Sequence, residues 1–247
     1  MKIAPKISLS FLITALLLTG ITVPIFYWTA KDSLQKAIFA HLRTTAKSRA
    51  EHVKTSLEDQ KHEAELIAES YWLENAMETI NNNHAGSPEL IEKIMSELKE
   101  YAHPEQGLYE VFVLNLDGKI IASSDRSKIG LNRSTDAYFL EGKKKTYIKD
   151  AYYSETTKQN SICVSTPIRT DETGNLLGVL VVRYNLKQLY KITTDTTGLG
   201  QTGEIYLVNK DGFIITPSRF RKDTFLKQMI GTKDKVTFTS TTKKWSL

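Results

Sequence analysis

The sequence has a single cysteine, and it lacks the short motifs that mark the common classes of enzyme. Cys163 has no partner for a disulfide bond, and its apolar neighbours Ile162 and Val164 predict a small core residue rather than a reactive thiol. No G-x-x-x-x-G-K-[ST], G-x-S-x-G or H-E-x-x-H pattern occurs, so we expect no enzymatic activity and no cofactor. None of the five histidines lies at the spacing from another histidine or from the cysteine that is typical of metal ligands, so we expect no metal site.

Long runs of one charge are missing as well. The formal net charge is +5, but acids and bases alternate along most of the chain, and the longest lysine run is residues 143–145. A protein that binds nucleic acid would favour a basic patch with interleaved aromatic residues, which this sequence does not have. We therefore expect no nucleic-acid partner. The apolar content of 40% is ordinary for a globular protein and is sufficient for a hydrophobic core.

What the sequence does have is a long uncharged segment near its start. Residues 7–30 contain no charged residue and are dense in Leu, Ile, Phe and Val. A bilayer core of about 30 Å needs about 20 such residues, whereas the apolar region of a cleaved signal peptide has about 7–15. The segment therefore predicts an uncleaved transmembrane helix. Because Lys2 and Lys6 precede it, residues 1–6 should be cytoplasmic and the rest outside, in a protein that crosses the membrane once.

After the apolar segment, residues 31–80 predict a long stalk helix. No Pro or Gly occurs between Lys31 and Met77, and strong helix formers such as Ala, Leu, Glu, Lys and Gln are frequent. Apolar residues recur near helical spacing, as at Leu34, Ile38 and Leu42, which leaves a narrow stripe in need of a partner. Two partners remain open, namely a second copy in a homodimer and the rest of the same chain.

The remaining sequence predicts an α+β fold. A helix should begin at Ser87 and Pro88, which suit an N-cap and a first helical turn, and should end before Pro104. From Leu108 the spacing of apolar residues is no longer that of a helix. It predicts strands at about 109–114, 119–122, 161–169 and 176–184, joined in antiparallel sheets. Short helices are expected at about 135–142 and 186–195. A hairpin turn is expected at residues 115–118, where Gly118 can accept a positive φ.

An internal repeat indicates two related modules in tandem. Residues 115–122, Asn-Leu-Asp-Gly-Lys-Ile-Ile-Ala, recur at 209–216 as Asn-Lys-Asp-Gly-Phe-Ile-Ile-Thr, and each copy follows an apolar stretch. Chance similarity of two hairpins is the alternative. The repeat divides the chain into a first module, 81–185, and a linker helix with a second module, 186–247. The second copy has no equivalent of 161–184, so we expect it to be incomplete, in a fragment or a truncated reading frame.

This organisation resembles the double Cache (PDC-type, PAS-like) sensor domains of bacterial transmembrane receptors. The resemblance covers about residues 31–220, and it rests on Tyr138-Phe139-x-x-Gly142, Thr146-Tyr147-Ile148-x-Asp150, Tyr152-Tyr153-Ser154, Ser165-Thr166-Pro167-Ile168, Gly178-Val179-Leu180 and the stretch 198–208. It implies an extracytoplasmic module, anchored in the inner membrane of a bacterium, that senses a small molecule for a histidine kinase, a chemoreceptor or a diguanylate cyclase. We expect this sequence to lack the output domain of such a receptor.

The resemblance also implies a ligand pocket in the first module, between its sheet and the loops over it. The matching positions are Tyr138, Phe139, Tyr147, Asp150, Tyr152, Ser154 and Ser165. Aromatic walls with a few polar groups suit a small ligand, although such tyrosines also suit the core or surface of a β-rich domain. Relatives that bind α-amino acids carry an Arg near the position of Asp136 and an Asp at that of Ser154, and Arg133 is out of register. The resemblance thus implies a ligand other than a standard amino acid.

Two further functions remain open from the sequence. A pilin-like or adhesive subunit also joins an apolar N-terminal helix to a β-rich head, but it would have an acid near the start of that helix, and none precedes Asp32. A non-functional receptor fragment is the other alternative, because the second module is short.

Overall fold

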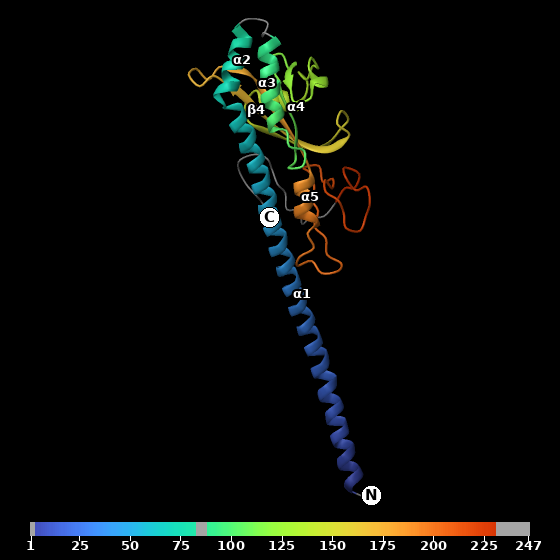
Figure 1. Cartoon of the computed structure of the whole chain (residues 1–247). Coiled ribbons are helices and arrows are strands. Elements are labelled where there is room, and N and C mark those ends of the chain that lie inside the picture. Colours follow the sequence, from blue (N-terminus) through green and yellow to red (C-terminus); the bar gives the residue numbers. More distant parts are fainter. Residues whose placement is uncertain (1–2, 83–87, 231–247) are drawn as a thin grey trace. The chain divides into compact units, whose positions relative to one another are not determined.

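The structure is a computed structural model that describes residues 3–82 and 88–230 (Figure 1). The chain divides into two compact units, Met1–Arg49 and Ala50–Leu247. The first unit consists of the N-terminal part of helix α1 (Ile3–Ala68). The second contains the end of α1 and all the other helices and strands among the described residues.

The N-terminal part of α1 exposes large apolar side chains all along its length. Phe11, Leu17 and Phe26, for example, are 75%, 62% and 74% exposed. The four threonines of residues 7–30 donate their hydroxyl groups to the carbonyl four residues earlier, at 2.7 to 2.9 Å. These hydroxyls therefore need no partner from outside the helix, which makes them tolerable in lipid. Among the described residues, this is the one helix that could cross a membrane by length and composition.

The predicted stalk helix over residues 31–80 is two helices rather than one. Helix α1 ends at Ala68, and α2 (Tyr71–Asn82) begins after Ser70. Ser70 Oγ donates to Ile67 O at 2.6 Å, and Ser70 O accepts from the N–H groups of Leu73 and Glu74. A serine that bonds the local backbone competes with a continuous helix, and this explains the break. The predicted loop residues 83–86 and the predicted N-cap Ser87 lie outside the described residues.

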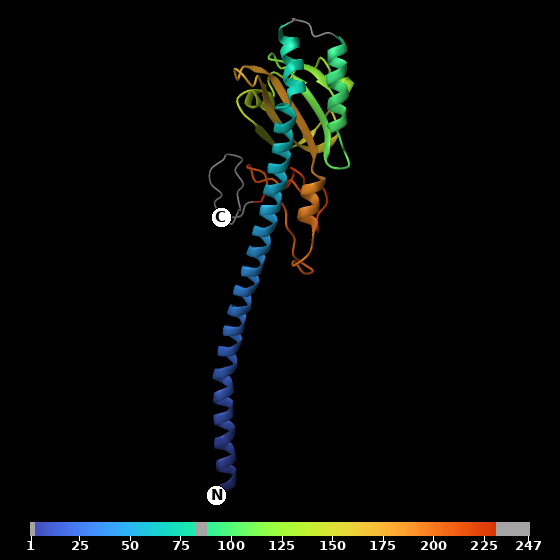
Figure 2. The same cartoon turned by 60° about the vertical axis from the view of Figure 1, so that its left-hand side comes forward.

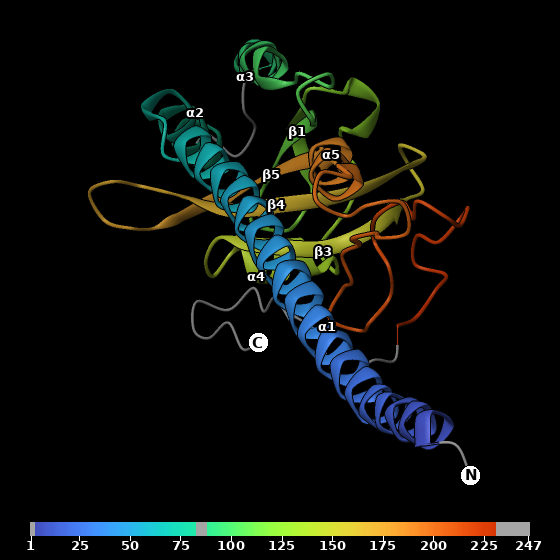
Figure 3. The ribbon, with the colours of Figure 1, turned by 90° about the horizontal axis from the view of Figure 1, so that it is seen from below.

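Five antiparallel strands form one sheet, in the order β2-β1-β5-β4-β3. They are β1 (Leu108–Leu114), β2 (Ile120–Ser123), β3 (Tyr147–Ser154), β4 (Gln159–Arg169) and β5 (Leu176–Asn185). Figure 3 shows β1, β5, β4 and β3 side by side in this order. The four predicted strands are confirmed to within two residues. Strand β3 was missed, because a bulge between Lys149 and Tyr152 breaks the alternation that marks a strand.

Each face of the sheet is covered by helices. Helices α2 and α3 (Pro88–Tyr101) pack on one face with the end of α1 (Figure 2), and the short helix α4 (Ala137–Gly142) packs on the other. Successive residues of a strand point to opposite faces, so Leu180 and Val182 join the core under α1 to α3, while Val179 and Val181 join the cluster under α4. The predicted helices at 135–142 and 186–195 are present as α4 and α5 (Lys187–Thr194), and a single 3-10 turn, η1 (Arg126–Lys128), follows β2.

The two copies of the repeat form the same turn. Asn115 Oδ1 accepts from the backbone N–H groups two and four residues later, at 3.1 and 2.9 Å. Asn209 Oδ1 accepts from the equivalent two groups, at 3.1 and 2.8 Å. Gly118 and Gly212 follow with φ of 80° and 86°, a region that favours glycine. The sequence repeat is therefore also a repeat of local structure.

The antiparallel pairing next to the turn is repeated as well, but it involves fewer residues in the second copy than in the first. Leu114 pairs with Ile120 in the first hairpin, and Val208 pairs with Ile214 at the corresponding place in the second. The second pair is an isolated bridge, and the described part of the chain has no helix or strand after α5. Two complete modules are thus not seen, and residues 231–247 of the predicted second module lie outside the described residues.

Candidate functional site

Helix α4 lies unusually close to the sheet because it ends in glycine. A Cβ atom on Gly142 would lie 2.7 Å from Ser165 Oγ and 2.9 Å from Val179 Cγ1, which is closer than packed atoms approach. The absence of a side chain lets α4 press Tyr138 and Phe139 against the strands, where each is only 2% exposed. The sequence Tyr138-Phe139-x-x-Gly142 therefore sets the distance between helix and sheet.

Five of the seven predicted site residues lie in or against the packed cluster between α4 and the sheet. Tyr138 and Phe139 come from α4, and Tyr147 and Tyr152 of β3 pack against the same cluster. Ser165 of β4 is buried opposite Tyr147 and donates a hydrogen bond to Tyr147 O at 3.4 Å. This cluster of side chains between α4 and the sheet is named the α4-face site below.

The other two predicted residues have different surroundings. Asp150 Oδ2 accepts from the backbone N–H of Lys210 at 3.4 Å, so its carboxylate contacts the turn of the second repeat. Ser154 Oγ lies 3.2 Å from Thr156 Oγ1 and accepts from Thr157 N at 3.4 Å, within the turn between β3 and β4. Thr156 Oγ1 in turn accepts from Arg183 Nη1 of β5 at 3.5 Å, so Ser154 is connected to Arg183 through Thr156.

A buried ion pair in the α4-face site was not predicted. Arg183 Nη1 of β5 donates to Glu110 Oε2 of β1 at 2.8 Å, and the two side chains are 6% and 3% exposed. The guanidinium carbon lies 5.1 Å from the centre of the Phe112 ring. A signal was present, since each charge interrupts a strand that is otherwise mostly apolar, and charged residues are rarely buried without a reason.

Several buried polar atoms of the α4-face site lack a hydrogen-bond partner within the described residues. They are Glu110 Oε1, Arg133 Nε, Tyr152 OH and Arg183 Nε, of which Tyr152 OH lies near the thiol of Cys163. Burial away from water raises the pKa of Tyr152, and the nearby Cys163 adds to this, so the phenol keeps its proton. Lys149 Nζ lies 4.2 Å from the centre of the Tyr152 ring. The site therefore offers three N–H or O–H donors and one carboxylate oxygen to a bound molecule.

A second acid lies at the edge of the same site. Tyr138 OH donates to Asp136 Oδ2 at 2.7 Å, and burial together with this carboxylate raises the pKa of Tyr138. Arg133 Nη1 lies 3.9 Å from the same oxygen. Arg133, although out of register in the sequence, therefore lies beside Asp136 and the hydroxyl group of Tyr138.

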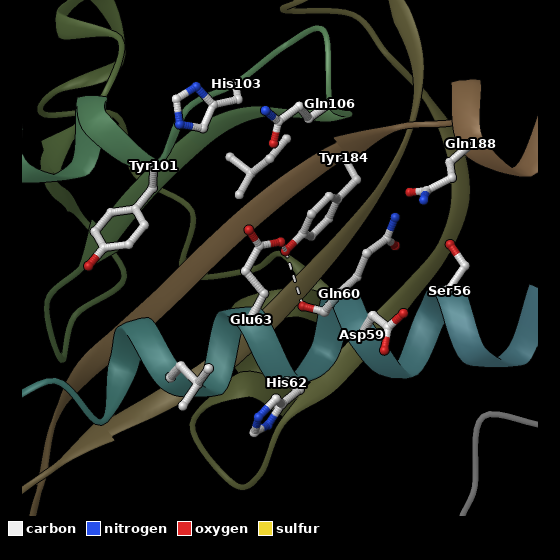
Figure 4. Close-up of a pocket in the computed structure, with 12 residues that line it drawn as sticks. Ser56, Asp59, Gln60, His62, Glu63, Tyr101, His103, Gln106, Tyr184 and Gln188 are labelled. Atoms are coloured by element: carbon white, nitrogen blue, oxygen red, sulfur yellow. Dashed lines mark hydrogen bonds between the residues drawn. The ribbon is translucent and has the colours of Figure 1, made fainter.

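A separate cavity lies on the opposite face of the sheet, against α1 (Figure 4). It is partly open to solvent, has a volume of about 380 Å³, and is lined by residues of α1, α3, β1, β5 and α5 and of the loop before β1. Tyr184 OH of β5 donates to Gln60 O at 3.1 Å and to Glu63 Oε2 at 2.8 Å across it. The sequence predicted no pocket here. It is named the α1-face cavity below.

Comparison with known proteins places these features in a family. The family model dCache_1, described as "Cache domain", matches residues 30–246. This range includes the whole sheet, both copies of the repeat and all the residues of the two sites. No curated protein sequence matches the chain.

Solved structures of bacterial sensor domains share the fold. The sensor domain of the V. cholerae histidine kinase DctB has a TM-score of 0.57 at 19% identity, over 74% of this chain and 67% of that one. The ligand-binding domain of the C. jejuni chemoreceptor Tlp3, in complex with 4-methylisoleucine, has a TM-score of 0.54 at 22% identity, over 75% and 69%. The ligand-binding domain of the P. fluorescens chemoreceptor CtaA, in complex with L-serine, has a TM-score of 0.55 at 18% identity. The match covers 78% of this chain and 77% of that one.

Proposed function

The chain belongs to the Cache domain family of extracytoplasmic sensors, and on this premise we propose that it senses a small molecule in the α4-face site for a bacterial receptor. The observation that carries the proposal is the group of buried polar atoms without partners around Tyr138 and Tyr152. Buried polar groups are nearly always hydrogen-bonded, so a ligand that supplies the partners would be held firmly. The family match favours this function over a pilin-like or adhesive subunit.

The donors and acceptors of the site suggest the chemistry of the ligand. Arg133 and Arg183 each offer a buried N–H, and Lys149 adds a positive charge nearby, which suits a carboxylate. Glu110 Oε1 would accept from an ammonium or hydroxyl group of the same molecule. We therefore propose a small carboxylate that also carries an N–H or O–H donor. The α-amino acids named in the Tlp3 and CtaA complexes are of this class, and 2-hydroxy acids are as well. This differs from the expectation from the sequence, which has no Arg or Asp at the positions that bind amino acids in relatives, because Arg133, Arg183 and Glu110 would supply the charges from other positions.

The anchoring of the sensor is part of the proposal. Residues 7–30 would span the inner membrane once, with residues 1–6 in the cytoplasm and the Cache domain outside. In the following segment Leu34, Ile38 and Leu42 are 62%, 48% and 39% exposed, and they lie on one stripe of α1. The exposed stripe supports a homodimer through the stalk. The repeated turn and pairing support a second module over 186–247 that follows a first module over 81–185.

A binding experiment on the detergent-solubilised full chain tests the proposed ligand site. Amino acids, 2-hydroxy acids and dicarboxylates would be screened by thermal shift, and hits measured by titration calorimetry. Tyr152→Phe removes one unpartnered hydroxyl and should weaken the best ligand about tenfold or more, as expected for a lost bond to a charged group. Tyr153→Phe is the matched control, because this neighbouring tyrosine is 46% exposed and should bind as the wild type does. Equal affinity in both variants, or no stabilising compound, would contradict the proposal.

A further inference from the structure

The stripe of α1 that packs on the sheet contains polar residues where packing alone would favour apolar ones. Val53, Ala64 and Ile67 are almost completely buried on this stripe. Between them, at helical spacing, Ser56 and Gln60 are also buried, with 7% and 6% of their surfaces exposed. An apolar residue at either position would complete the packing of helix against sheet, so the polar ones need a different explanation.

Neither polar side chain is satisfied by the protein. Ser56 Oγ and Gln60 Oε1 make no hydrogen bond to any of the described residues. Burying a hydroxyl or an amide oxygen without a partner lowers stability. Both residues line the α1-face cavity, and Figure 4 shows their side chains on the side of α1 that faces Tyr184 and Gln188. The unpartnered atoms therefore belong to a cavity with room for a small molecule.

The charge of the cavity selects a class of ligand. Asp59 and Glu63, both exposed, line it together with His62 and His103, whereas none of its lining residues, as far as the chain is described, is Lys or Arg. This is notable in a protein with a formal net charge of +5. Glu63 accepts one bond from Tyr184, which leaves its other oxygen and both oxygens of Asp59 for a ligand. Carboxylates together with Gln60 Oε1 make a set of acceptors that suits a cation with several N–H donors.

We propose that the α1-face cavity is a second ligand site, which binds a small organic ammonium ion such as a short diamine. One ammonium group bonds the carboxylates of Asp59 and Glu63, and N–H groups reach Gln60 Oε1 and Ser56 Oγ. The site lies on the opposite face of the sheet from the α4-face site and is independent of it. Because it joins α1 to Tyr184 of β5 and Gln188 of α5, its ligand holds the stalk helix to the linker helix.

Titration calorimetry of the solubilised full chain with 1,4-diaminobutane tests this site. We expect saturable binding of one diamine per chain, and no binding of the uncharged analogue 1,4-butanediol. Asp59→Asn and Glu63→Gln keep the size of each side chain and should each weaken the diamine about tenfold, since each removes a charge-assisted bond. Glu58→Gln is the matched control, because it makes the same change one residue from Asp59 outside the cavity and should bind normally.

Gln60→Leu separates a ligand role from a structural one. It removes an unpartnered buried amide, so we expect a higher Tm without ligand and loss of diamine binding. A structural Gln60 would give a lower Tm and unchanged binding, which would overturn the proposal. No diamine binding at millimolar concentration, equal binding of the diol, or equal weakening by Glu58→Gln would overturn it too. Tyr152→Phe should leave diamine binding unchanged, so the proposals for the two ligand sites can be tested independently of each other.

Discussion

Arg183 and Glu110 form an ion pair at 2.8 Å in the interior of the α4-face site, with almost no exposed surface on either side chain. Removing two charges from water is costly, and a pair of apolar residues in the same space is often as stable or more stable. The pair keeps one unpartnered atom on each residue, Arg183 Nε and Glu110 Oε1. We infer that it is retained for ligand recognition rather than for stability.

Loss of the Glu110 charge should destabilise the fold strongly. Glu110→Gln leaves the buried Arg183 without a counter-charge, and removal of one partner of a buried pair costs about 3–5 kcal/mol. Urea unfolding followed by circular dichroism measures this difference. Glu155→Gln is the control, because Glu155 forms an exposed ion pair with Lys158. This substitution should leave the midpoint of urea unfolding unchanged. Similar midpoints for the two variants would show that the buried pair carries no such cost.

The first hairpin should tolerate no side chain at Gly118. A Cβ there would lie 2.6 Å from Ser134 Cα, in addition to the cost of its φ of +80°. Gly174 has a similar φ of +69° but open space around it. We expect Gly174→Ala to cost about 1–2 kcal/mol from backbone strain, and Gly118→Ala a further 1–3 kcal/mol, roughly, from overpacking. Chemical denaturation of both variants checks this, and equal losses would mean that the Ser134 contact relaxes freely.

The second repeat should depend on Asn209 as the first depends on Asn115. Asn209→Ala removes two bonds to backbone N–H groups, those of Asp211 and Phe213. We expect the amide hydrogens of Phe213 and Ile214 to exchange about tenfold faster, because one local bond network closes this turn. Hydrogen exchange measured by mass spectrometry reports it. Protection of the sheet at residues 111–114 should stay unchanged, and a parallel loss there would show that the two hairpins unfold together.

Cys163 should be chemically inert in the folded protein. Burial raises the pKa of its thiol to about 11, from an ordinary value of 9.0. The folded state thus disfavours the thiolate, and the corresponding stability is complete below about pH 9 and is lost as the pH rises towards 11. A disulfide exchange reagent should not react at pH 8 until urea is added. Rapid stoichiometric reaction of the native protein would show that the thiol is accessible.

Part of the α4-face site could be predicted from sequence, and part could not. Tyr138, Phe139 and Gly142 form a local pattern, and the resemblance to a family transferred Tyr147, Tyr152 and Ser165 by position. Glu110 and Arg183 come from strands that are neighbours in the sheet but far apart in the chain. Their pairing depends on the register of β1 with β5, which no local pattern specifies. The bulge in β3 had the same effect on Asp150, since it changes the direction of side chains along that strand.

The amino-acid sequence by itself determined the apolar N-terminal helix, four of the five strands, the repeated Asn-x-Asp-Gly turn and the core position of Cys163. Each of these depends on neighbours within a few residues, so periodicity and turn chemistry are sufficient. Only the tertiary structure decided which polar groups are buried together, as in the ion pair of Arg183 with Glu110 and the cavity between Gln60 and Tyr184. Those relationships depend on sheet register and on how helices dock on its two faces, because contacts between distant segments form only when the chain is packed.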